Sequence, residues 1–136
     1  MAIDIEWEKF LGGPSQSTQT RWHVTIDKRA VILINGNLYR RLGKPEAVCL
    51  FFNRREQKIA VQPASPRFNE SFPIKPQRRG TSTYQVYAAP FCKHYGIALN
   101  ATHAFPRPDF SPDGKLILNL NDTVIVTRIR RKDRNV

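Results

Sequence analysis

The sequence predicts a mainly β protein with short helices, built as a small β-barrel from two repeated β-β-α-β-β-like halves. Three observations support this fold class. From residue 22 onward, apolar residues alternate with polar ones or form short runs rich in β-branched side chains. Turns containing glycine, proline or asparagine separate these runs at short intervals. A shift of 53 residues also lays the second half of the chain on the first.

The first half begins with a strand that ends before the turn Asp27-Lys28-Arg29. After the second strand, Asn35 is a good N-cap for a short amphipathic helix, and Gly43 is a good terminator for it. Pro45 prevents the helix from continuing. The predicted unit, residues 21–62, comprises strands 22–26 and 30–34, the short helix, and a hairpin of strands 48–52 and 58–61.

The second half, residues 82–120, repeats this order. Residues 31–34 align with 84–87, and residues 38–43 align with 91–96, so that apolar, basic and glycine positions coincide. After a further four-residue insertion, residues 58–61 align with 115–118, with Asp113-Gly114 as the hairpin turn. Each half has too few strands to be stable alone, so we predict that a tandem duplication shares one core.

The remaining segments connect or flank these halves within one β-rich domain, residues 21–127. Residues 63–81 are basic and proline-rich, which predicts a linker or loop with strand structure only around Phe72 to Ile74. Residues 1–20 form an N-terminal arm and flexible linker, in which 3–11 are either a short helix or a loosely ordered arm. Residues 128–136 are a basic tail, either solvated or ordered on binding.

The charge of the chain indicates its class of partner. Twenty-two Lys and Arg against eleven Asp and Glu give a net charge of +11, which favours polyanions. Dispersed basic pairs are also typical of a merely solubilising surface. We expect nucleic acid, DNA rather than RNA. The candidate binding residues are Lys28, Arg29, Arg40, Arg41, Arg54, Arg55, Arg78, Arg79, Lys93, Arg130 and Arg131.

Two tyrosines of the predicted strand 84–87 must face opposite ways. Tyr84 and Tyr87 are three residues apart, and side chains alternate between the faces of a strand. At most one of them can point into the core, and the other is the better candidate for stacking on a nucleic-acid base.

The stretch from Asp27 to Gly43, followed by residues 48–61, resembles the swapped-hairpin unit of the AbrB, SpoVT and MraZ transcription regulators. Their pattern is Asp, a Gly-Arg pair, three apolar residues, a proline, a Leu-Arg-rich helix ending in Leu-Gly, and a hairpin. The positions that match without a gap are Asp27, Ile32-Leu33-Ile34, Leu38, Arg40 and Leu42-Gly43. The resemblance implies a DNA-binding transcriptional regulator. It further implies a tandem arrangement like that of MraZ, which would form a closed or half-closed small β-barrel within one chain, or a homodimer as in AbrB.

Two departures limit what this resemblance transfers. Ala30 and Val31 occupy the positions of the Gly-Arg pair, and Asn35 occupies the position of the proline. The contact made by that arginine is therefore not inherited. Lys28 and Arg29, in the same turn, are the residues that could supply equivalent charge.

Other functions have weaker support. No nucleotide-binding, hydrolase or metalloprotease motif occurs, so we expect a protein that is not an enzyme and has no cofactor. A metal site is also not expected, because Cys92-Lys93-His94 lacks a second spaced pair of ligands. A metal-dependent nuclease using Asp109 with Asp113, or Asp27 with Glu56, is one alternative. The other is a viral or ribosome-associated structural or assembly protein that neutralises nucleic acid without reading its sequence.

The predicted location is the cytoplasm, in association with the nucleoid. The longest apolar runs, 31–34 and 48–52, are far shorter than the ~20 residues that cross a bilayer. The first eight residues are acidic where a secretory signal would be basic. The two cysteines provide no disulfide framework, which fits a reducing compartment.

Overall fold

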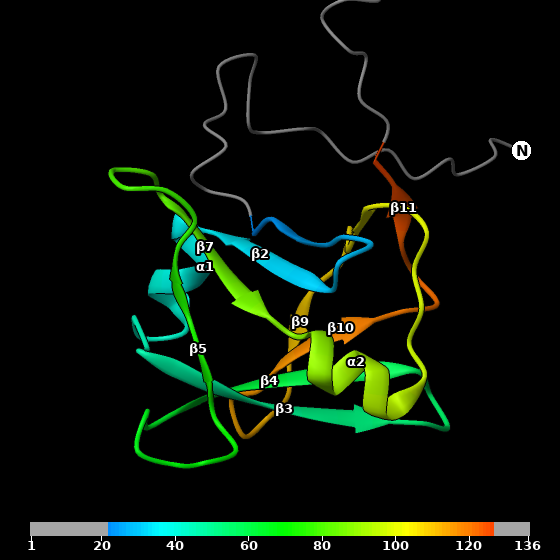
Figure 1. Ribbon diagram of the computed structural model, residues 1–136, viewed down its shortest axis with the longest axis horizontal. Helices are drawn as coiled ribbons and strands as arrows, with labels where there is room; N and C mark the ends of the chain where they lie inside the picture. Colours follow the sequence, from blue (N-terminus) through cyan, green and yellow to red (C-terminus); the bar gives the residue numbers. More distant parts are fainter. Residues whose placement is uncertain (1–21, 127–136) are drawn as a thin grey trace, which may run out of the picture.

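The computed structural model describes residues 22–126, which form two antiparallel sheets and two short helices (Figure 1). One sheet has the strand order β11-β8-β1-β2-β7-β6, and the other has the order β5-β3-β4-β10-β9. The six-stranded sheet consists of β1 (Val24–Ile26), β2 (Val31–Asn35), β6 (Lys75–Pro76), β7 (Thr83–Tyr87), β8 (His103–Ala104) and β11 (Val124–Ile125). The five-stranded sheet consists of β3 (Ala47–Asn53), β4 (Lys58–Ala64), β5 (Phe72–Pro73), β9 (Asp109–Phe110) and β10 (Leu116–Asn119). The helices are α1 (Gly36–Arg41) and α2 (Ala89–Tyr95).

The mainly β class with short helices is confirmed, but the two sheets of the described residues do not close into the predicted barrel. Each sheet is open, with an edge strand at either end. Two of these edges, β5 and β6, contain Pro73 and Pro76, which have no N–H to donate to a further strand. Pairing therefore stops at these edges instead of continuing around a barrel.

Residues 63–81 place short strands in both sheets. β5 lies where strand structure is expected, around Phe72 to Ile74, whereas β6 falls in the part expected to be a linker or loop. The chain leaves β4 and pairs Phe72 with Val48 at the edge of the five-stranded sheet. It then crosses to the six-stranded sheet, where Lys75 pairs with Gln85. Ile74, at the crossing, is buried and donates its backbone N–H to the carbonyl of Glu46 at 3.1 Å. The connection is thus part of the packed body.

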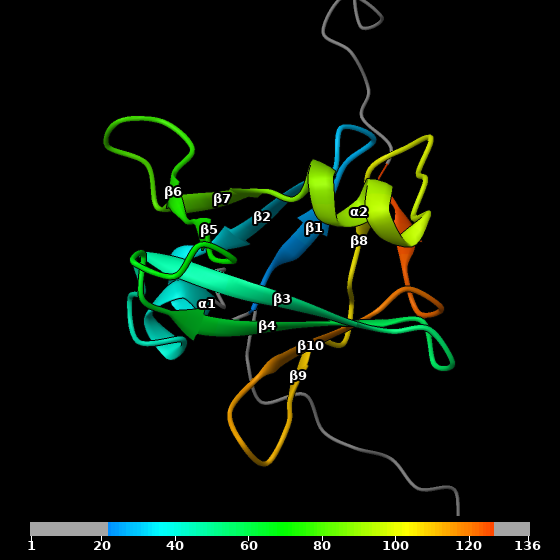
Figure 2. The same cartoon turned by 60° about the horizontal axis from the view of Figure 1, so that its bottom comes forward.

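The two sheets lie one over the other (Figure 2). The core lies between them and includes apolar side chains of the helices. Side chains alternate along each strand, so one face of each sheet turns inward. The inner faces supply Val24, Ile26, Ile32, Ile34, Val86, Val48, Ile59, Val61, Leu116 and Leu118. Leu38, Leu42 and Phe91 are buried in the same cluster.

The segments that the sequence alignment superimposes are neighbours in the sheets. β2 pairs with β7, with Val31 opposite Tyr87 and Ile34 opposite Tyr84. β4 pairs with β10 in the same antiparallel manner, with Ile59 opposite Leu118. These two pairings join the first half of the chain to the second in both sheets, and in the six-stranded sheet β1 also pairs with β8.

The helix boundaries follow the predicted signals. The Asn35 side chain accepts a hydrogen bond from the Leu38 N–H at 3.2 Å, as expected of an N-cap. Gly43, with φ of 90°, follows α1, and Gly96, with φ of 69°, ends α2. Within residues 22–126, neither helix is long and apolar enough to cross a membrane.

Leu38→Ala tests how far α1 depends on the shared core. The Leu38 side chain is completely buried, so its truncation should lower the free energy of unfolding by about 2–5 kcal/mol. Urea denaturation measures the loss. Phe68→Ala is the control, because Phe68 is 55% exposed and should change stability by less than about 0.5 kcal/mol. Equal losses in both variants would contradict the assigned core.

Ala30→Gly tests the turn between β1 and β2. Ala30 has φ of 64°, a left-handed conformation that costs an L-residue roughly 1–2 kcal/mol and glycine almost nothing. Glycine also costs about 0.5–1 kcal/mol because it gives the unfolded chain more entropy. Because this cost is smaller than the relieved strain, Ala30→Gly should have a higher free energy of unfolding, measured by urea denaturation. Ala60→Gly, inside β4, should lose stability instead. A loss in both variants would refute the left-handed turn.

Candidate nucleic-acid interface

The outer face of the six-stranded sheet holds a groove of about 760 Å³. On β1 and its flanks, His23, Thr25 and Asp27 face this groove, because they alternate with the buried Val24 and Ile26. The other lining side chains come from β2, α1, the β6–β7 loop and the segments near β8 and β11. They include Arg29, Leu33, Asn35, Asn37, Arg40, Gln77, Ser82, Thr83, Thr102 and Val126.

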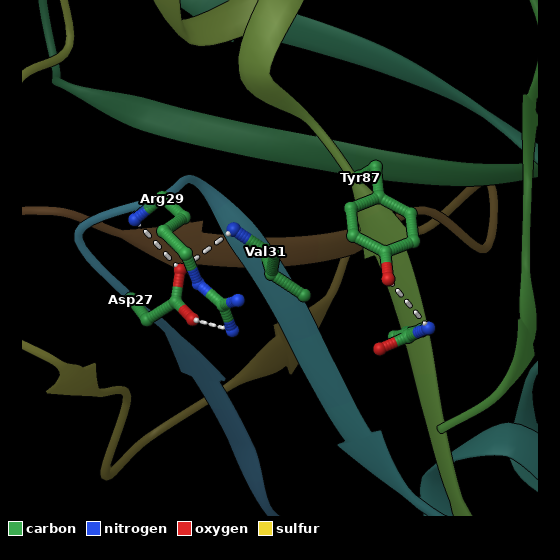
Figure 3. A network of polar contacts seen from close by, with 5 residues as sticks. Asp27, Arg29, Val31 and Tyr87 are labelled. Atoms are coloured by element: carbon green, nitrogen blue, oxygen red, sulfur yellow. Dashed lines mark hydrogen bonds and ion pairs between the residues drawn. The ribbon is translucent and has the colours of Figure 1, made fainter. Parts of the chain in front are cut away.

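Arg29 is fixed at one end of the groove by the carboxylate of Asp27 (Figure 3). One oxygen of Asp27 accepts the backbone N–H groups of Arg29 and Val31 at 2.9 and 3.0 Å. The other oxygen lies 3.2 Å from the Arg29 guanidinium. The Arg29 side chain is 75% exposed, so this ion pair adds little stability but directs the guanidinium. Asp27 has the turn role predicted from the sequence.

Arg40 reaches the groove from α1. The helix stands close to the β6–β7 loop because Gly36 has no side chain: a Cβ there would lie 3.1 Å from the Ser82 carbonyl oxygen. Tyr39 fixes the other side of the helix by stacking on Tyr84, with ring centroids 3.7 Å apart. Of the described carboxylates, none forms an ion pair with Arg40. Its charge is therefore available to an anion in the groove.

Further basic residues border the groove along β6 and the following loop. Lys75 is exposed and pairs with Gln85, which pairs with Leu33, so the three side chains share the outer face. Arg78 and Arg79 are exposed in the loop between Gln77 and Ser82, both of which line the groove. The Thr81 hydroxyl shapes this loop by donating to the Arg78 carbonyl at 2.9 Å.

Several candidate residues lie away from this face. The Arg41 guanidinium covers the Phe110 ring at 4.3 Å, and that of Arg54 covers the Tyr95 ring at 5.1 Å. Lys93 lies on α2, at the opposite end of the β2–β7 pair from α1, because the two strands run antiparallel (Figure 1). The predicted set therefore divides between the groove and other surfaces. Lys28 and Arg55 are exposed in turns, while Arg130 and Arg131 lie outside the described residues, as do the arm 1–20 and the tail 128–136.

Tyr87 and Tyr84 face opposite ways, as predicted. The Tyr84 ring stacks on Tyr39 against the core, whereas Tyr87 is 61% exposed on the outer face. The hydroxyl of Tyr87 accepts a hydrogen bond from the Gln85 amide at 3.0 Å. Charged residues and aromatic rings alone do not identify the uncharged groove residues Thr25 and Thr83. The alternation of polar with apolar residues along 23–27 is the signal that could have found Thr25.

The candidate metal ligands do not gather. Within residues 22–126, no group of three or more His, Cys, Asp or Glu side chains could hold a metal ion. Burial raises the pKa of the Cys92 thiol to about 11, so the thiol stays protonated at neutral pH. His103 contacts the Thr123 hydroxyl at 2.9 Å, and His94 is exposed on α2.

Asp109 and Asp113, named for a nuclease, serve the local backbone and turn. Asp109 accepts the Phe110 N–H at 2.8 Å. Asp113 binds the Ser111 hydroxyl and the Lys115 ammonium in the turn between β9 and β10, where Gly114 has φ of 88°. The hydrogen bond from Lys115 and then that from Ser111 lower the pKa of Asp113 to about 2.

Asp113 should accordingly titrate near pH 2 in the folded protein, below the 3.8 of the unfolded chain. Its contribution to the turn is present above about pH 4 and is lost as pH falls toward 2. Carboxyl-carbon NMR titration checks this, and Lys115→Met should move the midpoint upward because the ammonium is removed. A shift of the Asp113 signal on adding Mg²⁺ at pH 7 would contradict the turn role.

Comparisons with models of protein families, with curated proteins and with solved structures found no match for this chain.

Proposed function

We propose that the protein is a non-enzymatic DNA-binding regulator that holds the DNA backbone in the outer groove of its six-stranded sheet. The observation that supports this most directly is that Arg29 and Arg40, from a turn and a helix, line one groove. Guanidinium groups suit phosphate oxygens because they offer several donors in a planar fork. The net charge of +11 adds long-range attraction for the same partner.

The resemblance to the AbrB and MraZ regulators has local support in the turn before β2. Ala30 occupies the position of the glycine in that family and has φ of 64°, a conformation that glycine adopts freely. In the family an arginine follows this glycine, and here Val31 holds that position. Arg29, the residue before Ala30, lines the groove and supplies a positive charge from the same turn. A place in the cytoplasm beside the nucleoid is part of the same proposal.

A tandem duplication is also part of this proposal, and the pairing of β4 with β10 supports it. The alignment lays Ile59 on Leu116 and Val61 on Leu118, and all four side chains are buried in the core, as a twofold axis through this strand pair requires. The pairing of β2 with β7 adds no support, because the shift of 53 residues lays the buried Ile32 on Gln85, which faces outward.

A packaging or assembly role is the second candidate, because basic residues also cover other faces. Lys93 and Arg55 are exposed away from the groove, as is Arg67 in the loop after β4. Such a protein would neutralise DNA or RNA without reading sequence. Selection from random DNA discriminates between the two: a recovered motif supports the regulator, and random recovery supports packaging.

The groove is tested with Arg40→Ala and the matched control Arg67→Ala, each of which removes one exposed charge. Fluorescence anisotropy with labelled DNA, both single- and double-stranded, should show binding at 50 mM salt that weakens steeply toward 200 mM. Arg40→Ala should weaken binding and reduce the slope of log K against log salt by about 1, the loss of one phosphate contact. Arg67→Ala should retain the original slope.

Two results would refute the proposed function. Absence of binding to either form of DNA at 50 mM salt would exclude it altogether. Equal effects of Arg40→Ala and Arg67→Ala would show that charge acts from the whole surface, as the packaging role requires.

A further inference from the structure

Beside the groove, the sheet presents an exposed aromatic ring in line with Arg29. Asp27, directly after β1, lies in one row with Val31 of β2 and Tyr87 of β7, because the Asp27 N–H donates to the Val31 carbonyl and Val31 pairs with Tyr87. Three adjacent strands span about 10 Å, so the ring lies within one or two nucleotides of the Arg29 guanidinium. Figure 3 shows Arg29 and Tyr87 on the two sides of Val31.

The shape of the surface distinguishes two forms of DNA. Proteins that read duplex DNA insert a protruding helix or β-ribbon into the major groove, which is about 12 Å wide. Here the polar and apolar side chains Thr25 and Leu33 lie inside a concave groove, bordered by α1 and Ser82. A duplex laid on this face would touch the rim with its phosphates and leave its bases far from Thr25 and Leu33.

A single strand can use all of these groups together. Its phosphates can reach Arg29 and Arg40, and one base can stack on the ring of Tyr87, a residue that is 61% exposed. The hydroxyls of Thr25 and Thr83 can donate to or accept from an unpaired base edge. The hydrogen bond from Gln85 to the Tyr87 hydroxyl holds the ring in place before the strand binds.

From this arrangement we infer that the outer face of the six-stranded sheet binds single-stranded DNA, with Tyr87 as a stacking platform and Arg29 and Arg40 as phosphate contacts. The inference rests on the proposed function, which names DNA, and specifies the form of DNA that this surface takes. The tyrosine supplies the uncharged part of the binding energy, and the arginines supply the salt-dependent part.

The test compares one labelled DNA strand of about sixteen nucleotides, alone and annealed to its complement, with the RNA strand of the same sequence. Anisotropy at 50 mM salt should give tighter binding of the single DNA strand than of the duplex or the RNA. Tyr87→Ala should weaken single-strand binding about fivefold or more, the loss of one stacked base. The slope of log K against log salt should stay unchanged in Tyr87→Ala, because the ring carries no charge.

Two controls separate stacking from general effects. Tyr87→Phe keeps the ring but loses the hydrogen bond from Gln85, so it should bind more weakly than the original protein and more tightly than Tyr87→Ala. Phe68→Ala removes an equally exposed ring beside the five-stranded sheet and should leave the affinity unchanged. Circular dichroism on heating verifies that Tyr87→Ala remains folded, and Tyr87→Leu provides a second ring-free variant with a residue that packs better in a strand.

Each outcome has one meaning. Tighter binding of the duplex, or full single-strand affinity in Tyr87→Ala, would overturn this inference. In either case, weaker DNA binding by Arg40→Ala would still support the proposed function. Tighter binding of the RNA strand would overturn the choice of DNA. If neither form of DNA binds, the proposed function fails as well.

Discussion

The pairing of β2 with β7 is the constraint on which the rest of the structure depends. It joins the two halves of the chain within the six-stranded sheet, and its register decides which side chains face the core. A slip by one residue would bring Ile32 and Ile34 to the solvent and would turn Val31 and Leu33 inward. The same register places Tyr87 beside the β1–β2 turn and puts α1 and α2 at opposite ends of the strand pair. The inner face of the β2–β7 pair therefore contributes to the core, and its outer face contributes to the candidate interface.

Features set by neighbouring residues could be predicted from the sequence. Asn35 caps α1 through its own side chain, and Gly43 and Gly96 adopt the positive φ values that end helices. Most of the two-residue strands could not be predicted in this way. An exception is β5, which lies where the sequence indicates strand structure. β8, in contrast, has no periodicity to detect, and its position depends on pairing with β1, far away in sequence. Barrel closure failed as a prediction for the same reason, since it is decided at the edges.

The candidate interface shows a similar division. The alternation of side chains in a strand correctly separated Tyr84 from Tyr87. Adjacent arginines were a poorer guide, because successive residues of a helix point about 100° apart. Arg40 consequently lines the groove, while Arg41 covers the Phe110 ring of the other sheet. A run of basic residues in the sequence thus gives the amount of charge but not its direction, which only the docking of α1 on the sheets determines.

The edges of both sheets have a consequence for self-association. Among the described strands, all four that end a sheet, β5, β6, β9 and β11, are only two residues long. Such short ends, two of them containing proline and one containing Lys75, offer almost no backbone for a strand of another molecule to extend. A β-rich chain is thereby protected from the edge-to-edge stacking that leads to fibrils. For the part of the chain from residue 22 to 126, association of two copies is therefore expected through side chains on the faces of the sheets and not by merging the sheets.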